Sequence, residues 1–421
     1  MKSERLVAGL DIGSARTTAV IAEVVGEVPK RPGIRVLGVG HARTTGLRRG
    51  MVADIEETTR SIRQAMSDAE RLAGVKVDGA FVGIAGEHVQ AMTSRGIVAI
   101  SGDEISRADV ERVNEVARAQ AIPQDRELLH AIPQEYTVDR TSGIQDPIGM
   151  TGLRLETEMY LVTIGSAPAN NLRKSVERAG YRVRQLVLEP FASALAVLTE
   201  DEKELGVALV ELGAASTDVA VFHEGKIRHL QTVGFGGANV TSDLVHGLGV
   251  TQHDAEQLKE QFGVAYESLV DPGEVIQLPG TPAQGERQIP RELMAHIIHQ
   301  RLDEIFDLVQ RGVQTAGYAG RLSGGVVVTG GGAAMPGVVE MLGEAFGTGA
   351  RMGTPGEPVG GLRDAIESPR FSTVAGLALY GASRIALGGA TGGGAKRLPR
   401  PSSPGMDRWA QRIKLWLQDF F

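Results

Sequence analysis

The first clear pattern in the chain is a run of apolar residues from Leu6 to Leu10, which is followed by a short turn from Asp11 to Ala15. A second run, from Thr17 to Val24, is rich in β-branched residues. Apolar runs of this length, bounded by turn residues, are typical of buried strands. The sequence therefore predicts a β-hairpin with a carboxylate, that of Asp11, at its mouth.

The same pattern returns in the middle of the chain. An acid, a glycine and a threonine occur at identical spacing in both places: Asp11, Gly13 and Thr17 in the first segment, and Glu211, Gly213 and Thr217 in the second. Internal similarity of this kind indicates a repeated structural unit. The sequence therefore predicts two related lobes, each built around such a hairpin.

A second repeat supports this interpretation. Glu189 and Pro190 open a predicted helix that ends at Leu198, and Thr373 opens another that ends at Gly381. Both alternate small and large residues, and small residues allow two helices to pack closely. Two unrelated core helices would have the same composition, but together with the hairpin repeat a duplicated lobe is the stronger interpretation. The small residues expected at the crossing are Ala192, Ala196, Gly376 and Ala378.

A separate small α/β unit is predicted between about Val82 and Ile164, with Val82 to Gly86 as its opening turn. Helical spacing of apolar residues runs from Ile105 to Ile122, and Ser106 is a candidate N-cap. The expected strands of this insert are Ala131 to Val138 and Met159 to Ile164.

A second insert, from about Gly236 to Gly317, is predicted to be mostly helical. The stretch from Asp271 to Pro290 is rich in proline and glycine, and such a composition favours a loop.

Composition excludes several classes of function. The 421 residues carry a net charge of −7, so no basic field is available to hold nucleic acid. The absence of cysteine excludes disulfides, thiolate metal sites and cysteine catalysis, and suits a reducing cytosol. No apolar run approaches the length of a membrane span, and the N-terminus lacks the apolar core of a signal peptide.

Three glycine-containing turns stand where a phosphate-binding protein would need them. Two are the hairpin turns, and the third lies between a predicted strand, beginning at Val326, and a helix that starts near Pro336. Glycine lets phosphate oxygens approach the backbone N–H groups of a turn. Asp11 and Glu211 would face each other across a cleft, where two carboxylates can hold a hydrated Mg²⁺.

These motifs, in this order, resemble the phosphate 1, connect 1, phosphate 2, adenosine and connect 2 motifs of the actin-like ATPase superfamily, over residues 5 to 385. Two segments of the first insert, 132–139 and 143–156, resemble the distinctive insert of the FtsA family of bacterial cell-division proteins. Residues 236–241 and 255–259 resemble that family as well.

The resemblance implies an α/β fold: a two-lobed actin-like ATPase fold with duplicated lobes and a nucleotide cleft between them, together with the family's small α/β insert and a C-terminal amphipathic helix. It implies ATP and Mg²⁺ as cofactors, with Asp11 and Glu211 binding the metal through water. Glu189 would orient the attacking water, although a glutamate before proline is also a routine residue at a helix start. The residues implied in nucleotide binding are Gly13, Ser14, Ala15, Arg16, Gly213, Ala214, Ala215, Ser216 and Thr217 for the phosphates, Gly237, Glu256 and Lys259 near the ribose and base, and Gly330, Gly331, Gly332 and Ala333 beside the adenine.

One position departs from the family pattern. The phosphate 2 motif usually carries aspartate, and this chain has Glu211, which is one methylene longer and is followed by Ala214 and Ala215 in place of the commoner glycine or threonine. Efficient phosphoryl transfer requires closely held geometry. We therefore expect ATP binding with slow hydrolysis at most.

The end of the chain predicts a membrane anchor. A linker rich in glycine and proline spans residues 388–405, and the apolar side chains of residues 406–421, except that of Leu415, fall on one face of a helix. Such a helix lies in the membrane interface, with cationic residues reaching the headgroups. The alternative is a helix that packs against the core of the protein. Such a helix would have the same apolar face, but the preceding linker disfavours this arrangement. The residues expected at the membrane are Trp409, Arg412, Ile413, Lys414, Trp416, Leu417, Phe420 and Phe421.

The resulting hypothesis is a structural ATPase that polymerises on the inner face of the cytoplasmic membrane at the division site. The resemblance implies that it tethers filaments of the tubulin-like division protein through residues 236–317, associates with itself through both inserts, and meets later division proteins and anionic lipid. The alternatives are a sugar-kinase-like enzyme and an actin-like ATPase of pilus assembly. The expected domains are 1–81, 165–197 and 370–387 for the first lobe (1A), 82–164 for its insert (1C), 198–235 and 318–369 for the second lobe (2A), 236–317 for the helical insert (2B), 388–405 for the linker and 406–421 for the anchor.

Overall fold

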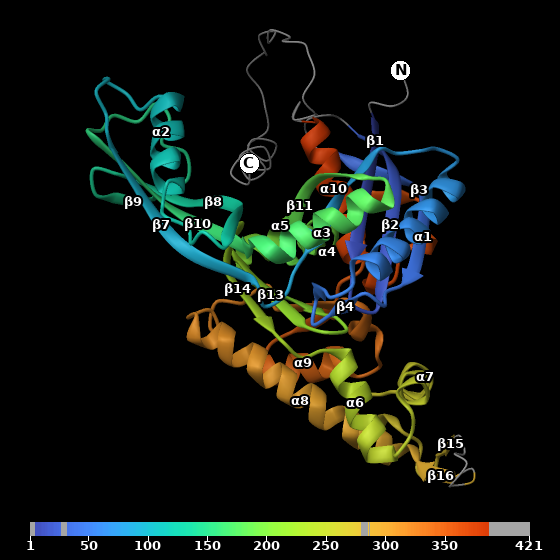
Figure 1. The fold of residues 1–421 in the computed structure, drawn as a ribbon. Helices are drawn as coiled ribbons and strands as arrows, with labels where there is room; N and C mark the ends of the chain where they lie inside the picture. The colour runs from blue at the N-terminus through green and yellow to red at the C-terminus, as the bar shows by residue number, and fades with distance from the viewer. Residues whose placement is uncertain (1–4, 27–31, 279–284, 286, 387–421) are drawn as a thin grey trace. The chain divides into compact units, whose positions relative to one another are not determined.

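The structure is a computed structural model that describes residues 5–26, 32–278, 285 and 287–386 (Figure 1). The chain divides into two compact units. One comprises Met1–Val24, Ile34–Glu87 and Leu172–Gly381, and the other comprises Val25–Gly33, His88–Asn171 and Ala382–Phe421.

The first unit contains two larger sheets, and the first of these, which we call sheet 1, has six strands. Its order is β11-β6-β1-β2-β3-β19. Helix α1 packs closely on β3, because a Cβ on Gly40 of that strand would lie 2.0 Å from the carbonyl oxygen of Ala65 in α1. The strands are β1 (Leu6–Ile12), β2 (Arg16–Val25), β3 (Gly33–Arg43), β6 (Gly79–Ile84), β11 (Arg182–Leu188) and β19 (Val359–Gly361); the neighbouring elements are α1 (Ile55–Ala73), α3 (Ser166–Ala179), α4 (Glu189–Val197), α10 (Ser372–Ala386) and the short pair β4 (Leu47–Arg48) and β5 (Met51–Val52).

The second large sheet, sheet 2, has five strands in the order β14-β13-β12-β17-β18. Its strands β12 and β17 are entirely buried, which is typical of sheets covered on both faces. The elements are β12 (Val207–Leu212), β13 (Thr217–His223), β14 (Lys226–Val233), β17 (Val326–Thr329), β18 (Ala350–Met352), α5 (Glu200–Leu205) and α9 (Val338–Phe346), with 3₁₀ turns η3 (Gly331–Ala334), η4 (Arg363–Ala365) and η5 (Pro369–Phe371).

The predicted repeat is confirmed by strand register. Asp11 pairs with Thr18 across the first hairpin, and Glu211 pairs with Asp218 across the second. Each hairpin also continues into a parallel neighbour, because β1 pairs with β6 and β12 pairs with β17. Both sheets therefore carry the acidic residue at the same place, near the end of the first hairpin strand.

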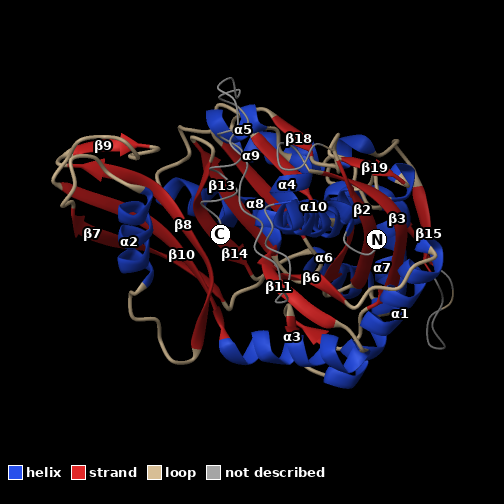
Figure 2. Cartoon of the chain, turned by 90° about the horizontal axis from the view of Figure 1, so that it is seen from above, coloured by secondary structure: helices blue, strands red, loops and turns tan. Residues whose placement is uncertain are grey.

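The predicted close crossing of two small-residue helices is also confirmed. A Cβ on Gly376 of α10 would lie 1.8 Å from the carbonyl oxygen of Ala192 in α4, and Figure 2 shows these helices side by side. Gly9 of β1 also lies close to α10, since its Cβ would lie 2.6 Å from the carbonyl oxygen of Val374. Helix α10 is thus fixed between sheet 1 and α4.

Two expectations for the first insert need correction. Val82 to Ile84 do not form a turn; they are the end of strand β6. This strand pairs with β1 on one side and with β11 on the other, and all its residues are buried. The helix α2 (Arg107–Arg118) ends four residues before Ile122. Pro123 explains why Ile122 is not helical, because proline disfavours the helical conformation in the residue that precedes it.

The second unit contains a four-stranded sheet in the order β7-β10-β8-β9. Helix α2 contacts β7 and β10 of this sheet, and its start is a capping box formed by the predicted cap Ser106 and by Asp109. The strands are β7 (Val89–Ala99), β8 (Arg126–Val138), β9 (Thr141–Ile144) and β10 (Arg154–Gly165), so both predicted strands exist and begin five residues earlier than expected.

The helical insert of the first unit contains one element that the sequence did not predict. The stretch from Asp271 to Pro290, expected as loop, includes the antiparallel pair β15 (Val275–Leu278) and β16 (Arg287–Pro290). Ile276 and Leu278 are buried in the core of this lobe while their neighbours are exposed, which gives a short strand pattern of period two. The remaining elements are α6 (Gly237–Leu248), α7 (Gln252–Phe262), η2 (Glu267–Leu269) and α8 (Arg291–Thr315).

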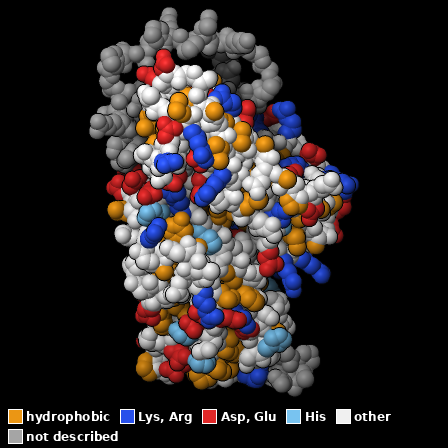
Figure 3. All heavy atoms as spheres, turned by 90° about the vertical axis from the view of Figure 1, so that its left-hand side faces the viewer, with side chains coloured by type: hydrophobic (Ala, Val, Ile, Leu, Met, Phe, Trp, Pro, Cys, Tyr) orange, Lys and Arg blue, Asp and Glu red, His pale blue; other side chains and the backbone are white. Residues whose placement is uncertain are grey.

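Within the described residues, no helix is both long enough and apolar enough to cross a membrane. The face drawn in Figure 3 carries cationic and anionic side chains intermixed. The predicted linker at 388–405 and the predicted membrane residues between Trp409 and Phe421 lie outside the described residues.

A buried histidine makes the stability of the second unit depend on pH. His130 in β8 is 4% exposed, and burial, aided by the positive charge of Arg384, lowers its pKa to about 4. The unfolded chain binds a proton near pH 6.5 and the folded chain does so only near pH 4, so stability falls as the pH drops between these values. We expect a loss of about 2–3 kcal/mol between pH 7 and pH 4.5 from this residue.

Urea unfolding of the protein and of His130→Gln at these two pH values measures the effect. The variant should lose less stability on acidification than the unsubstituted protein. Equal losses in the two proteins would show that His130 is not responsible.

Candidate functional site

Four carboxylates gather within the first unit. Asp11 lies near the end of β1, Glu211 near the end of β12, Glu189 at the start of α4, and Asp218 in β13 opposite Glu211. Burial raises the pKa of Asp11 to about 7 and that of Glu211 to about 8. The pKa of Glu189 is raised well above its ordinary value by burial and then by repulsion from the three other carboxylates. The group is therefore close enough to share one electrostatic environment.

Hydroxyl groups hold two of these carboxylates. Ser193 of α4 donates to Glu211 Oε2 at 3.1 Å, and Thr373 of α10 donates to Glu211 Oε1. Asp218 accepts hydrogen bonds from the hydroxyls of Ser216 and Thr232 at 2.8 and 2.6 Å.

Asp218 also accepts a hydrogen bond from the backbone N–H of Gly86, at the end of the segment that follows β6. Burial nevertheless raises its pKa. Uncharged hydroxyl and backbone N–H donors thus orient the carboxylates of Glu211 and Asp218.

The cluster has the chemistry of a site for a hydrated cation. Among the described residues, none of the four carboxylates forms an ion pair with lysine or arginine, and their mutual repulsion opposes ionisation. No three His, Asp or Glu side chains in the described part of the chain are arranged to ligate a metal directly. Mg²⁺ keeps most of its waters and needs few protein oxygens, so the residues fit a magnesium ion that meets the carboxylates through water.

The two hairpin turns have matching geometry. A Cβ on Gly13 would lie 3.0 Å from the carbonyl oxygen of Arg16, and a Cβ on Gly213 would lie 3.0 Å from that of Ser216. The backbone N–H of Gly213 donates to the latter oxygen at 3.0 Å. Thr17 and Thr217, which end the turns, are fully buried, whereas the turn residues remain at least partly exposed. Both predicted phosphate turns are therefore rigid at their bases and open at their tips.

Helix α6 begins against the second turn. The N–H groups of Gly237 and Ala238 donate to the carbonyl oxygens of Gly213 and Ala214 at 2.9 and 2.8 Å. A helix start carries partial positive charge, which favours an anion nearby. The structure thus brings the predicted residue Gly237 next to the predicted phosphate turn.

Lys259 connects this helix start to α7. Its Nζ donates to the carbonyl oxygen of Gly237 at 3.0 Å, to the hydroxyl of Thr241 at 2.7 Å and to Glu256 at 2.8 Å. Glu256 and Lys259, predicted near the ribose and base, therefore form one fixed polar cluster beside Gly237.

The third glycine turn packs on the end of β12. Gly330 has φ +86°, and its Cβ would lie 2.7 Å from the carbonyl oxygen of Leu212. Gly331, Gly332 and Ala333 belong to η3, and α9 starts at Val338, two residues after Pro336, near which the helix start was predicted. Only glycine suits the positive φ and the close approach at position 330. The turn therefore adjoins the strand that carries Glu211.

Sequence reasoning missed Ser193, Thr373 and Asp218 as members of the site. The repeat itself contained a signal for Asp218, because this residue replaces Thr18 at the matching position of the second hairpin. Ser193 and Thr373 gave no such signal, since small residues in both helices indicated packing alone.

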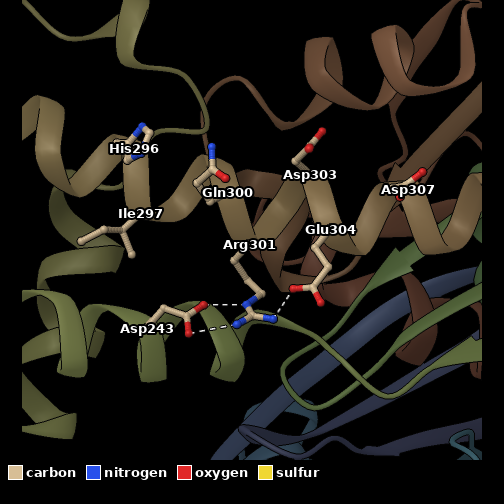
Figure 4. A pocket seen from close by; sticks show the side chains of 8 residues that line it. All are labelled: Asp243, His296, Ile297, Gln300, Arg301, Asp303, Glu304 and Asp307. Atoms are coloured by element: carbon tan, nitrogen blue, oxygen red, sulfur yellow. Dashed lines mark hydrogen bonds and ion pairs between the residues drawn. The ribbon is translucent and has the colours of Figure 1, made fainter.

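A hollow of 580 Å³ lies between α6 and α8, in the helical insert (Figure 4). Arg301 projects into it and is held by Asp243, at 3.0 Å from Nη2 to Oδ1, and by Glu304. Four acidic side chains and one arginine give it a net negative lining. The lining residues are Asp243, His296, Ile297, Gln300, Arg301, Asp303, Glu304 and Asp307.

Comparison with solved structures identifies the fold. The PilM–PilN type IV pilus biogenesis complex matches with a TM-score of 0.63 and 17% identity over 89% of this chain and 98% of the matched chain. MreB5 of Spiroplasma citri bound to ADP matches with a TM-score of 0.55 and 14% identity over 92% of this chain and 99% of the other. These likenesses establish the actin-like fold that the sequence predicted.

Sequence comparison identifies the family. A model of the SHS2 domain inserted in FtsA matches residues 86–163, and a model of cell division protein FtsA matches residues 208–376. The cell division protein FtsA of Pseudomonas aeruginosa is 38% identical over 100% of this chain and 99% of its own length. That of Escherichia coli K12 is 32% identical over 99% and 98%. The chain belongs to the FtsA family of cell division proteins.

Proposed function

We propose that the protein binds ATP with Mg²⁺ between the two hairpin turns of the first unit. The observation that carries this proposal is a cluster of four carboxylates, of which two are buried and two are partly exposed, without a cationic partner among the described residues and beside two glycine turns of matching geometry. MreB5, which shares the fold, has been solved with ADP and with AMPPNP. The metal would neutralise phosphate charge that the turns alone cannot offset.

Each predicted residue has a role in this proposal. Residues 13–16 and 213–217 cradle the phosphates, and Asp11 and Glu211 hold the waters of the metal. Lys259 and Glu256, fixed beside Gly237, face the ribose and base. Residues 330–333 border the adenine.

We further propose that hydrolysis is slow at most. Glu189 is the candidate for orienting the attacking water, and burial and neighbouring carboxylates raise its pKa well above the usual range. The chain also has Glu211 where the phosphate 2 motif usually carries aspartate, followed by Ala214 and Ala215. Efficient phosphoryl transfer requires closely held geometry, so we infer that binding rather than catalysis is the main task of the site.

Membership of a cell-division family favours a structural role over sugar phosphorylation or pilus assembly. We infer that the protein polymerises on the inner face of the cytoplasmic membrane and tethers filaments of the tubulin-like division protein. The proposed domains are those expected from the sequence, with self-association through both inserts and contacts with later division proteins. The proposed anchor is the amphipathic segment 406–421, outside the described residues.

The hollow between α6 and α8 supports the choice of the helical insert as the partner-binding region. Arg301 lies over the ring of Phe235, at 5.7 Å from its centroid, and is fixed by Asp243 and Glu304. An ordered arginine set among acidic side chains and Ile297 can recognise a segment that carries both charge and apolar side chains. A short segment of the tubulin-like partner fits this description.

Electron microscopy of the protein on anionic lipid monolayers tests the assembly proposal. With Mg-ATP we expect filaments on the lipid, and without nucleotide we expect few or none, because ATP favours one closed state of the lobes. A chain ending at Leu387 should bind ATP equally well but leave the monolayer bare. Equal lipid binding by this shortened chain would contradict the anchor, and identical filaments with and without ATP would contradict nucleotide-dependent assembly.

A further inference from the structure

Glu211 is longer by one methylene than Asp11, which occupies the matching position of the other hairpin. A longer side chain has one more rotatable bond, and an unrestrained carboxylate on it would lose more entropy when it engages a metal. The side chain of Glu211 is nevertheless buried, and its residue is 8% exposed. Contacts within the protein must therefore fix the torsion angles of the Glu211 side chain.

Two hydroxyls do so, each from a different helix. Ser193 of α4 donates to one carboxylate oxygen at 3.1 Å, and Thr373 of α10 donates to the other. The two hydroxyl oxygens lie 3.1 Å apart, so they form a compact pair. Ser193 is fully buried and Thr373 is 4% exposed, so water does not compete for these hydrogen bonds.

This pair lies at the crossing of α4 and α10. Ser193 follows Ala192, whose carbonyl oxygen would be 1.8 Å from a Cβ on Gly376, and Thr373 lies one helical turn before that glycine. The backbone at the crossing leaves no room for the helices to shift independently. The carboxylate on β12 is thus hydrogen-bonded to both helices of a closely packed pair.

We propose that Ser193 and Thr373 are positioning residues of the nucleotide site, which hold the Glu211 carboxylate in the orientation that receives the waters of Mg²⁺. Each carboxylate oxygen can accept about two hydrogen bonds, so one hydroxyl on each leaves room for a metal-bound water. The pair compensates for the extra methylene of Glu211 by fixing the additional torsion. This inference rests on the proposed binding of Mg-ATP and concerns two residues whose role that proposal leaves open.

Calorimetric titration of ATP, with Mg²⁺ and with EDTA, tests the proposal on purified full-length protein. Thr373→Val removes the hydroxyl and keeps the shape, and it should lower the affinity for Mg-ATP about tenfold, the effect of losing one hydrogen bond to a charged group. The affinity measured in EDTA should stay the same. Thr373→Ser, which restores the hydroxyl, should remain within about twofold of the unsubstituted protein. Ser193→Ala should act in the same direction.

The matched control is Ser372→Ala. Ser372 precedes Thr373 in α10 and is also buried, and its hydroxyl accepts a hydrogen bond from Thr329 at 2.7 Å rather than donating to one of the four carboxylates. Its loss should lower the melting temperature much as Thr373→Val does and leave the effect of Mg²⁺ on ATP affinity unchanged. If Thr373 acted through packing alone, Thr373→Val and Ser372→Ala would have the same influence on the effect of Mg²⁺ on ATP affinity.

A double substitution separates positioning from indirect damage. In a Glu211→Gln background, Thr373→Val should cause no further loss of magnesium-dependent affinity, because the carboxylate on which it acts is gone. An additive loss would overturn the proposal. So would unchanged magnesium dependence in both Thr373→Val and Ser193→Ala when the unsubstituted protein binds Mg-ATP. Failure of the unsubstituted protein to bind ATP at all, or equal affinity with Mg²⁺ and EDTA, would instead overturn the proposed function and this inference with it.

Discussion

Gly376→Ala is expected to unfold the protein or prevent its accumulation in soluble form. The added Cβ would lie 1.8 Å from the carbonyl oxygen of Ala192 and 2.3 Å from its carbonyl carbon. Both are backbone atoms of a buried helix, so no side-chain rotation can relieve the overlap. Helices α4 and α10 must separate, and overpacking combined with a broken crossing should cost more than about 3 kcal/mol.

Urea unfolding, or the soluble yield where no folded protein remains, measures this effect. Gly320→Ala is the control, because Gly320 is exposed and a Cβ there meets nothing within 4 Å. That variant should stay within about 0.5 kcal/mol of the unsubstituted protein. A Gly376→Ala protein of normal stability would contradict the close crossing.

Asp11→Asn is expected to weaken the binding of Mg-ATP by about 100-fold or more, which corresponds to about 2.7 kcal/mol. The substitution preserves shape but removes one of the two charges proposed to hold the metal. The nucleotide-free protein should become more stable, by about 1–3 kcal/mol, because asparagine relieves repulsion among the four clustered carboxylates. Loss of binding together with a gain in stability is a combination that general damage cannot produce.

Calorimetry and thermal melting of the same samples check both effects. Asp78→Asn is the matched control, because the Asp78 carboxylate is exposed, lies outside the cluster and pairs with Arg182 and Arg184. It should leave ATP affinity unchanged and slightly lower stability. Unchanged Mg-ATP affinity in Asp11→Asn would remove Asp11 from the metal site.

The sequence predicted those features that repeat or that leave a local signature. The spacing of acid, glycine and threonine predicted two hairpins of the same register, and the structure pairs Asp11 with Thr18 and Glu211 with Asp218. Small residues in two helices predicted their crossing. Ser106 predicted the start of α2, because a cap is a local signal.

Other features depend on contacts between distant residues and left no local signal. The hydroxyl of Thr373 meets a carboxylate 162 positions earlier in the chain, and a threonine at a helix start usually indicates a cap. The pair β15 and β16 consists of strands of four residues each, too short to distinguish from loop by periodicity. The hydrogen bond that Thr373 donates to Glu211 could therefore be identified only from the structure and not from the sequence.

The most direct test of the nucleotide site is a crystal structure of the protein with a non-hydrolysable ATP analogue and Mn²⁺, located by its anomalous scattering. We expect the phosphates between residues 13–16 and 213–217, one manganese ion whose waters contact Asp11 and Glu211, and the adenine beside residues 330–333. A nucleotide bound elsewhere, or a metal that does not approach these two carboxylates, would contradict this expectation.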